Sequence, residues 1–286
     1  MTRAANRFVD RDHAHIRVVP LPGRVAEAKD ASGHEHDESG RFTGPGEGAL
    51  AAGQHKEIKP GVHKVTTADG KSYAVKDRVG AAESAHREAR VNELAQIAGV
   101  STPRTAVGRH QGKPASVQEW AEGTTVSSLT PAARHAALAG AREQVERHTL
   151  FDYLVGHSDG HTGNFVVGGD GSFHGIDKEM VLDKGNTDER FRVDNKGPLA
   201  ALAGDRSADT HPLDPGMVKD MASRGRKMAA HLSAAGDRKN AARVLNRAEV
   251  LEKHVSTGGK TVGDLRQASG APPVSVAKVW RNLFGA

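Results

Sequence analysis

The stretch LFDYLVGHSDGHTGNFVVGGDGSFHGIDKEMVL, residues 150–182, decides the fold. It opens with an apolar helix end at 150–155 and continues into a short polar loop, GHSDGHTGN. Two short runs, 165–167 and 173–176, flank a Gly-Gly-Asp-Gly turn and predict a β-hairpin. This order of helix, loop and hairpin brings three oxygen-bearing side chains to one edge of a small sheet: Asp159, Asn164 and Asp177.

These three side chains suit phosphoryl transfer from Mg·ATP. That reaction needs positioning and charge neutralisation from a protein rather than covalent chemistry. Asp159 can meet the attacking hydroxyl, while Asn164 and Asp177 offer the hard oxygen ligands that Mg²⁺ prefers. The interval from Asp159 to Asn164 reproduces that of the kinase catalytic loop, H-R-D-x-x-x-x-N. The alternative is an ordinary polar turn, in which Asp, Asn and Gly are common.

Length and composition leave room for two lobes and exclude several protein classes. The 286 residues, 37% of them hydrophobic, are enough to bury a core. The chain has no cysteine, which excludes disulfides and thiolate metal sites. It has no transmembrane run and no signal-peptide pattern, so we expect a cytoplasmic protein. A net charge of +5 suits an anionic substrate, but scattered basic residues and 4% aromatics argue against nucleic acid as a partner.

A second β-hairpin is predicted upstream, where 61–67 and 72–76 flank an Asp-Gly turn. Its alternation turns Lys76 away from the apolar face and toward a ligand. A kinase strand carries such a lysine to the α- and β-phosphates, as in V-A-I-K, and the string here is YAVK. The turn before the hairpin would cover the phosphates with a single glycine, Gly61. The alternative for Lys76 is an ordinary solvated strand-end lysine.

Residues 81–98 have the spacing of a helix that ends at Gly99. Glu88 flanks the apolar stripe of this helix and is the candidate for the ion pair that orients Lys76. The alternative for Glu88 is an ordinary surface charge.

Two more strands are predicted at 104–108 and 115–120. The second ends at Glu119 and Trp120 and runs into a connector that contains glycine. Such a connector suits a hinge between lobes, whose backbone groups could bind an adenine edge. Trp120 could instead pack in a core, as single aromatic residues usually do.

Helical patterns make up most of the second half. One helix is predicted from Thr130-Pro131 to about Leu154, which leads into the loop. Residues 184–215 lack periodicity and stand where a kinase carries an activation or substrate segment. Further helices are predicted at about 215–235, 238–256 and 274–284.

The first 55 residues are rich in glycine, histidine and charge, and we expect a flexible segment. His34, Glu35, His36 and Asp37 could bind a metal, but no apolar residue fixes their geometry, which favours a solvated linker. The string DESGRFTG, residues 37–44, resembles linkers of some bacteriophage structural proteins and hints at a phage origin.

In their order along the chain, YAVK, the helix with Glu88, VQEW, FDYLVGHSDGHTGNFVV and GIDKEMVL resemble a two-lobed kinase. The resemblance covers about residues 55–185 and is to the phosphatidylinositol 3-/4-kinase-like atypical kinases. These include small bacterial and phage members and the serine kinases of toxin–antitoxin modules. The resemblance implies an α+β fold, with a small antiparallel sheet and one helix in an N-lobe at 56–122 and a mainly helical C-lobe at 123–286.

The same resemblance implies ATP and Mg²⁺ as cofactors. It places Asp159 and His161 at catalysis, Asn164 and Asp177 on the metal, and five residues at the nucleotide: Lys76, Glu88, Gly61, Glu119 and Trp120. Two departures stand out, because Gly160 replaces the family arginine and Lys178-Glu179 follows the metal aspartate in place of Phe-Gly.

Several functions stay open at this point. The first is an ATP-dependent phosphotransferase, whose acceptor would be a protein Ser/Thr hydroxyl or, less favoured, a lipid inositol. Another is a nucleotide-binding pseudokinase that serves as an interaction module, for which the charges of Lys178-Glu179 beside the metal aspartate could divert Mg²⁺. A third is a basic linker protein without a nucleotide site. The string HSDGHTGN with IDKE also resembles aminoglycoside and choline phosphotransferases, although these usually carry more helical chain between Trp120 and Asp159.

Overall fold

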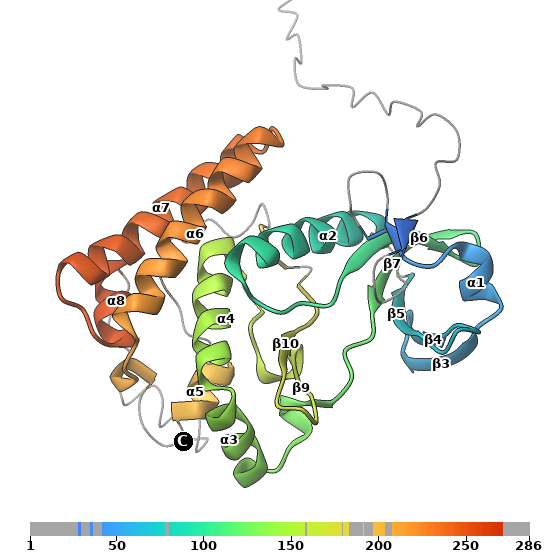
Figure 1. Cartoon of the computed structure of the whole chain (residues 1–286), viewed down its shortest axis with the longest axis horizontal. Coiled ribbons are helices and arrows are strands. Elements are labelled where there is room, and N and C mark those ends of the chain that lie inside the picture. The colour runs from blue at the N-terminus through green and yellow to red at the C-terminus, as the bar shows by residue number, and fades with distance from the viewer. Residues whose placement is uncertain are drawn as a thin grey trace, which may run out of the picture.

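In the computed structural model the described residues are 28–29, 35–36, 42–77, 80–157, 159–178, 180–182, 191, 197–203 and 208–270. The helix expected at 274–284, the side chains of the candidate metal cluster at 34–37 and Glu179 lie outside them. The fold is α+β, as predicted, with an antiparallel sheet at one end and helices at the other (Figure 1).

A five-stranded antiparallel sheet forms the amino-terminal lobe, at the right of Figure 1. Its order is β3-β4-β5-β7-β6, with β3 at Gln54–Lys59, β4 at Val62–Thr66, β5 at Ser72–Lys76, β6 at Thr105–His110 and β7 at Lys113–Glu119. The predicted hairpin is confirmed, since Val65 pairs with Tyr73 and Val62 with Lys76. One face of the sheet buries an apolar cluster of Leu50, Val65, Tyr73, Val75, Ala115 and Val117.

The N-lobe begins earlier than the sequence suggested. The expected boundary at residue 55 lies within β3, and a short helix, α1 (Glu47–Ala51), precedes that strand. Leu50 of α1 is fully buried in the apolar cluster of the sheet. The sequence hid this helix because a single buried leucine among Gly and Ala gives no periodic signal.

The predicted helix at 81–98 is confirmed as α2, Ala81–Ala98, which crosses the other face of the sheet and reaches the helical lobe (Figure 1). It ends at Gly99, whose φ of 67° is the left-handed cap that glycine adopts without strain. Val91, Leu94 and Ala98 are buried in the core of the helical lobe. Because α2 packs on both lobes, it fixes Glu88 at the place where they meet.

The helix expected from Thr130 to Leu154 is two helices in the structure. Thr130 caps the first one, α3 (Pro131–Gly140), as predicted, by accepting a hydrogen bond from Ala133 N. The helix breaks at Ala141, whose φ of −102° and ψ of 21° leave the α region, and α4 (Arg142–Val155) follows. Gly140 weakens the helix at this point, so the chain can turn and bury both α3 and α4 in one core.

The polar run predicted at 184–215 also contains structure. A short helix, α5 (Pro198–Ala203), buries Leu199 and Leu202 in the helical lobe. Six residues are too few to give a helical pattern in sequence, which is why the run was expected to be structureless. The remaining helices are α6 at Pro215–Ala234, α7 at Arg238–Ser256 and α8 at Val262–Ala268, of which the first two were predicted.

The second predicted hairpin lies between the two lobes (Figure 1). Its strands are β9 (Phe165–Val167) and β10 (Phe173–Gly175), and β8 (Thr124–Thr125) pairs with β9 to form a three-stranded sheet. The connector from the first lobe therefore passes directly over the hairpin. At Gly123 the approach is so close that a Cβ atom would collide with the carbonyl oxygen of Val167.

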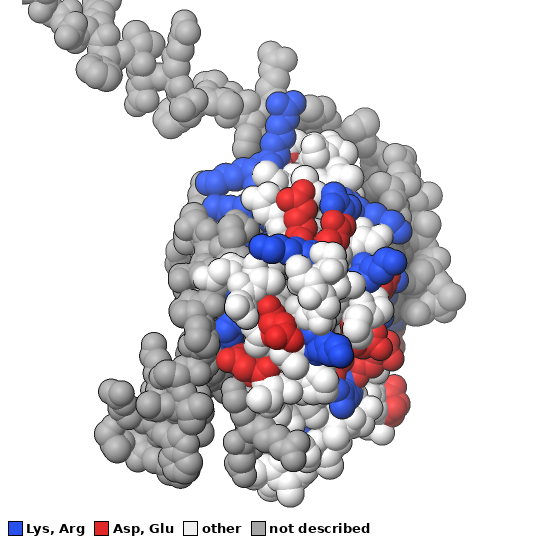
Figure 2. Space-filling view, turned by 90° about the vertical axis from the view of Figure 1, so that its left-hand side faces the viewer, with Lys and Arg blue, Asp and Glu red and all other residues white. Residues whose placement is uncertain are grey.

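Charge on the side of the molecule that carries α7 and α8 is mixed in sign. Figure 2 shows Lys and Arg interspersed with Asp and Glu on that face. One such pair joins α6 to α7, where Arg226 and Glu252 form a two-pronged ion pair. This face therefore offers no single-sign surface for a nucleic acid backbone. No helix within the described ranges is long and apolar enough to cross a membrane.

Candidate active site

Lys76, at the end of β5, lies between two carboxylates from distant parts of the chain. Its Nζ is 2.5 Å from Glu88 Oε1 on α2 and 2.8 Å from Asp177 Oδ1 after β10. Ser116 Oγ on β7 donates to the second oxygen of Glu88, at 2.7 Å. The contact that the sequence predicted between Lys76 and Glu88 is present, and the hydroxyl of Ser116 fixes its orientation.

The charges of this trio support one another despite burial. Lys76 is 6% exposed and Glu88 1% exposed. Burial alone would lower the pKa of the Lys76 ammonium, but the neighbouring carboxylates of Glu88 and Asp177 outweigh it and raise this pKa above its usual value. Lys76 is therefore a fixed positive charge at the junction of the lobes, which is what an anionic phosphate requires.

Asp177 has a backbone conformation that is rare for a residue with a side chain. Its φ is +56°, in the left-handed region that aspartate tolerates better than most residues. Such conformations tend to occur where a side chain has to point in a particular direction for function. The carboxylate points at the first lobe, where Oδ2 is also 4.0 Å from Nζ of Lys59, at the end of β3. Two lysines thus converge on Asp177, Lys76 from β5 and Lys59 from β3, which lies on the other side of β4.

Asn164 lies beside Asp177 because of the hairpin register. Ile176 N donates to Asn164 O at 2.8 Å, so Asn164 and Asp177 stand at the same end of two paired strands. Asn164 is 5% exposed, and its Nδ2 donates to the carbonyl of Asp159 at 2.7 Å. This bond uses the amide nitrogen, whereas a cation would use the oxygen. Asn164 therefore connects the loop of Asp159 to the hairpin that carries Asp177.

Asp159 presents its carboxylate at the surface of the loop. Its side chain is 51% exposed and lies 3.6 Å from Nε2 of His161. The other ring nitrogen of His161 accepts a hydrogen bond from Gly163 N at 3.0 Å, which fixes the ring on the loop. An exposed carboxylate next to an oriented imidazole is accessible to an incoming hydroxyl. Such access is compatible with the catalytic roles expected for Asp159 and His161.

Lys178 turns away from Asp177 and into the protein. Its Nζ lies 2.8 and 3.0 Å from the two oxygens of Asp152 on α4 and 4.6 Å from the ring centre of Phe165. Burial would raise the pKa of the Asp152 carboxyl, but the charges of Lys178 and His157 hold it well below its usual range. The expectation that the charge of Lys178 could divert a metal from Asp177 is therefore wrong, because the Lys178 ammonium is bound by Asp152.

Sequence reasoning missed Asp152, although a signal was present. It is the one acidic residue in the apolar run LFDYLV, on a helix end predicted to be buried. A carboxylate in such a place needs a positive partner, so a search for a buried lysine could have found the pair.

Glu119 and Trp120, which the sequence suggested for a hinge, both contact other side chains. The Glu119 carboxylate forms a two-pronged ion pair with Arg104, with distances of 2.7 and 3.0 Å. The Trp120 ring is half-buried, with the Lys64 ammonium 4.4 Å from its centre. The N–H groups of Glu119 and Trp120 both donate to carbonyls of neighbouring chain. An adenine edge would therefore have to bond to connector atoms other than these two N–H groups.

Gly61 forms the turn between β3 and β4 with a φ of 70°. Its carbonyl accepts a hydrogen bond from Asp77 N, next to Lys76, at 3.2 Å. The turn therefore lies against the end of β5, next to Lys76.

The sequence matches no protein-family model and no curated protein. Among solved structures, the chain is similar to a Helicobacter pylori proinflammatory kinase, CtkA, at 12% identity and a TM-score of 0.42, covering 74% of this chain and 95% of that one. It is also similar to a chain of the Shewanella oneidensis toxin–antitoxin complex of HipA, HipB and operator DNA, at 12% identity and a TM-score of 0.44, covering 71% and 66%. A third likeness is to an aminoglycoside phosphotransferase of Alicyclobacillus acidocaldarius, at 13% identity and a TM-score of 0.34, covering 77% and 93%. At such identities and scores, these likenesses decide neither chemistry nor substrate.

Proposed function

We propose that the chain is an ATP-dependent phosphotransferase that moves the γ-phosphate of Mg·ATP to a hydroxyl, in the first place that of a protein Ser or Thr. The observation that carries the proposal is the buried position of Lys76 between Glu88 and Asp177. Lys76 and Asp177 lie 101 positions apart in sequence, yet the fold brings them into direct contact. Maintaining a buried ammonium with two carboxylates is expensive in desolvation, so stability alone is a poor explanation for it.

In this proposal Lys76 binds the α- and β-phosphates while Glu88 keeps the ammonium in place. Lys59, on the strand that leads into the Gly61 turn, adds a second positive charge near Asp177. These cations offset the negative charge of the nucleotide at the position where the lobes meet.

The residues around Asp177 fit a magnesium ion. A carboxylate and an amide oxygen, from Asp177 and Asn164, are the hard ligands that Mg²⁺ takes together with phosphate oxygens and water. Bound there, Mg²⁺ would supply charge neutralisation at the phosphates. Asn164 can serve because its bond to the Asp159 carbonyl occupies only the amide nitrogen.

Asp159 would act on the acceptor. Its exposed carboxylate can accept the proton of the hydroxyl as the hydroxyl oxygen attacks the γ-phosphorus, with ADP as the leaving group. His161 keeps the loop in shape through Gly163 and lies close enough to Asp159 to orient the carboxylate.

The test is label transfer from γ-³²P-ATP with Mg²⁺ to the protein itself, generic protein substrates, phosphatidylinositol vesicles and an aminoglycoside. We expect transfer by the wild-type protein and a loss of about 100-fold or more in Asp159→Ala and Asp177→Ala. Asp170→Asn is the matched control, because this exposed aspartate lies in the turn of the same hairpin and should leave transfer unchanged.

The recipient of the label decides the acceptor class among protein, lipid and small molecule. No transfer to any acceptor, or equal transfer by Asp177→Ala and the wild type, would contradict the proposal. Label uptake from α- but not γ-labelled ATP would replace phosphate transfer by nucleotide transfer.

A further inference from the structure

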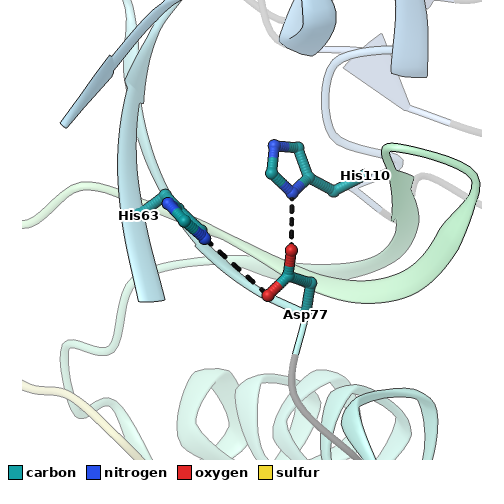
Figure 3. A group of neighbouring side chains, drawn as sticks. All are labelled: His63, Asp77 and His110. Atoms are coloured by element: carbon teal, nitrogen blue, oxygen red, sulfur yellow. Dashed lines mark hydrogen bonds and ion pairs between the residues drawn. The ribbon is translucent and has the colours of Figure 1, made fainter. Parts of the chain in front are cut away.

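Three side chains gather on the face of the five-stranded sheet that is turned away from α2, separate from the proposed active site. They are His63 on β4, Asp77 directly after β5 and His110 at the end of β6. Figure 3 shows the Asp77 carboxylate between the two imidazole rings. Asp77 Oδ2 lies 2.9 Å from His110 Nδ1, and Oδ1 lies 3.8 Å from His63 Nε2.

The strand register places these side chains together. His63 pairs with Val75, two residues before Asp77, and His110 pairs with Lys113 at the end of the β6–β7 hairpin. Side chains two apart on a strand share a face, so all three side chains project to the same side. One ligand atom from each lies within 4.8 Å of the other two.

The cluster is better enclosed than a surface ion pair. The side chains of His63, Asp77 and His110 are 21%, 14% and 1% exposed. Among the described residues, His110 Nε2 is buried and has no hydrogen-bond partner, and the ring bonds to Asp77 through Nδ1. His55 covers the His110 ring by stacking on it at 5.3 Å, while its own Nε2 is hydrogen-bonded to Leu50 O.

We propose that His63, Asp77 and His110 bind a divalent transition metal of the zinc type. Two imidazole nitrogens and one carboxylate oxygen are a common three-ligand set for Zn²⁺, with water in the fourth position. Tetrahedral zinc with bonds near 2.0–2.1 Å separates its ligand atoms by about 3.3 Å. The shorter contact, from Asp77 Oδ2 to His110 Nδ1, is 2.9 Å, and His63 Nε2 lies 3.8 Å from the other oxygen, Oδ1. One ligand atom from each residue lies within 4.8 Å of the others, so the three side chains would have to move closer together to reach the spacing of bound Zn²⁺.

Charge also favours a cation at this position. With both imidazoles neutral, the three ligands carry one negative charge, which the metal neutralises. Lys113 adds positive charge nearby, but its side chain is exposed and its field is screened by water.

The site would stabilise the strand end that carries Lys76. Asp77 follows Lys76 in the chain, and its N–H is bonded to the carbonyl of Gly61 in the β3–β4 turn. A metal held by side chains from β4, the end of β5 and β6 would therefore fix β5 and that turn from the sheet face opposite α2. The binding itself does not depend on the proposed phosphotransfer.

The test measures metal in the full-length protein after the affinity tag has been removed and bound metal has been stripped with chelator. Zn²⁺ is then added in competition with a chromophoric chelator, stoichiometry is read by mass spectrometry of the metal, and unfolding is followed with and without Zn²⁺. We expect one Zn²⁺ per chain at the cluster and a Zn²⁺-dependent rise in melting temperature. His63→Ala and Asp77→Asn should each weaken binding at least tenfold and remove that rise.

His135→Ala is the control, since His135 is an exposed histidine of α3 in the other lobe. Asp77→Asn nearly preserves side-chain shape and decides the matter if His63→Ala does not fold. The proposal is overturned if the wild type fails to compete for Zn²⁺ at micromolar concentration. It is also overturned if Asp77→Asn binds Zn²⁺ as tightly as His135→Ala.

Discussion

Replacing Lys76 by Met should separate the stability of the buried ion pair from its function. Glu88 is 1% exposed; its Oε1 would lose Lys76, while Oε2 keeps the bond from Ser116. Removing one member of a buried pair costs about 3–5 kcal/mol, because the other charge stays buried and uncompensated. The bond from Ser116 remains, so we expect Lys76→Met to lower the free energy of unfolding by about 3 kcal/mol.

The double variant, Lys76→Met with Glu88→Gln, should be more stable than Lys76→Met alone. It removes the uncompensated charge and leaves a neutral amide that can still accept from Ser116, so its cost should fall to about 1–2 kcal/mol. Urea unfolding of the wild type, both single variants and the double variant measures the coupling energy. Neither variant that lacks Lys76 should bind Mg·ATP, however stable it is.

Lys64→Met is the matched control, because Lys64 pairs with Ala74 and lies on the same sheet face as Lys76. Its ammonium is partly exposed and touches the Trp120 ring, so its removal should cost no more than about 1 kcal/mol. Wild-type stability in Lys76→Met, or a double variant less stable than Lys76→Met, would refute the assignment of Glu88 as a buried partner that depends on Lys76.

Three further expectations concern stability. Asp152→Asn should cost about 3–5 kcal/mol in urea unfolding, because it removes the charged partner of the buried Lys178. The fully exposed Asp170→Asn should leave stability essentially unchanged. Burial holds the pKa of His148 at about 3 in the folded protein, below the ordinary 6.5, so the unfolded chain binds this proton more readily. The contribution to stability is therefore full above pH 6.5 and falls as the pH drops from 6.5 toward 3. Between pH 7.5 and 5 this single histidine should account for about 2 kcal/mol, and an unchanged pH dependence in His148→Phe would show that reasoning to be wrong. In thermal melts Gly123→Ala should lower the melting temperature, because the φ of Gly123 is 136° and an added Cβ would collide with backbone. Gly140→Ala, with open space around the new Cβ, should stabilise the protein by about 0.5–1 kcal/mol. A higher melting temperature for Gly123→Ala than for Gly140→Ala would contradict this.

Local patterns were sufficient to predict the elements that carry the site. Alternation around an Asp-Gly turn located the strand of Lys76, and a helical stripe ending in glycine located α2 and its Glu88. The loop with Asp159 and the hairpin before Asp177 follow from the same kind of signal. Each of these features depends on residues close together in sequence, and such local patterns determine the secondary structure that forms.

What the sequence did not reveal depends on contacts between distant residues. The break at Ala141 follows from packing two helices into one core, and the burial of Lys178 follows from a carboxylate 26 positions earlier. The cluster of His63 and His110 requires knowing that β7 lies between β5 and β6. None of these relations leaves a periodic trace in the chain.

The central claim is that Lys76, Asn164 and Asp177 form one site for Mg·ATP, and nucleotide binding tests it most directly. The measurement is the melting temperature with a non-hydrolysable ATP analogue, with and without Mg²⁺, for the wild type and Asp177→Ala. At 100 times the Kd, binding stabilises by about 2.7 kcal/mol, which corresponds to a rise of roughly 5–10 °C for a chain of this size. We predict that rise only for the wild type with both analogue and Mg²⁺. No Mg²⁺-dependent rise in the wild type, or an equal rise in Asp177→Ala, would contradict the claim.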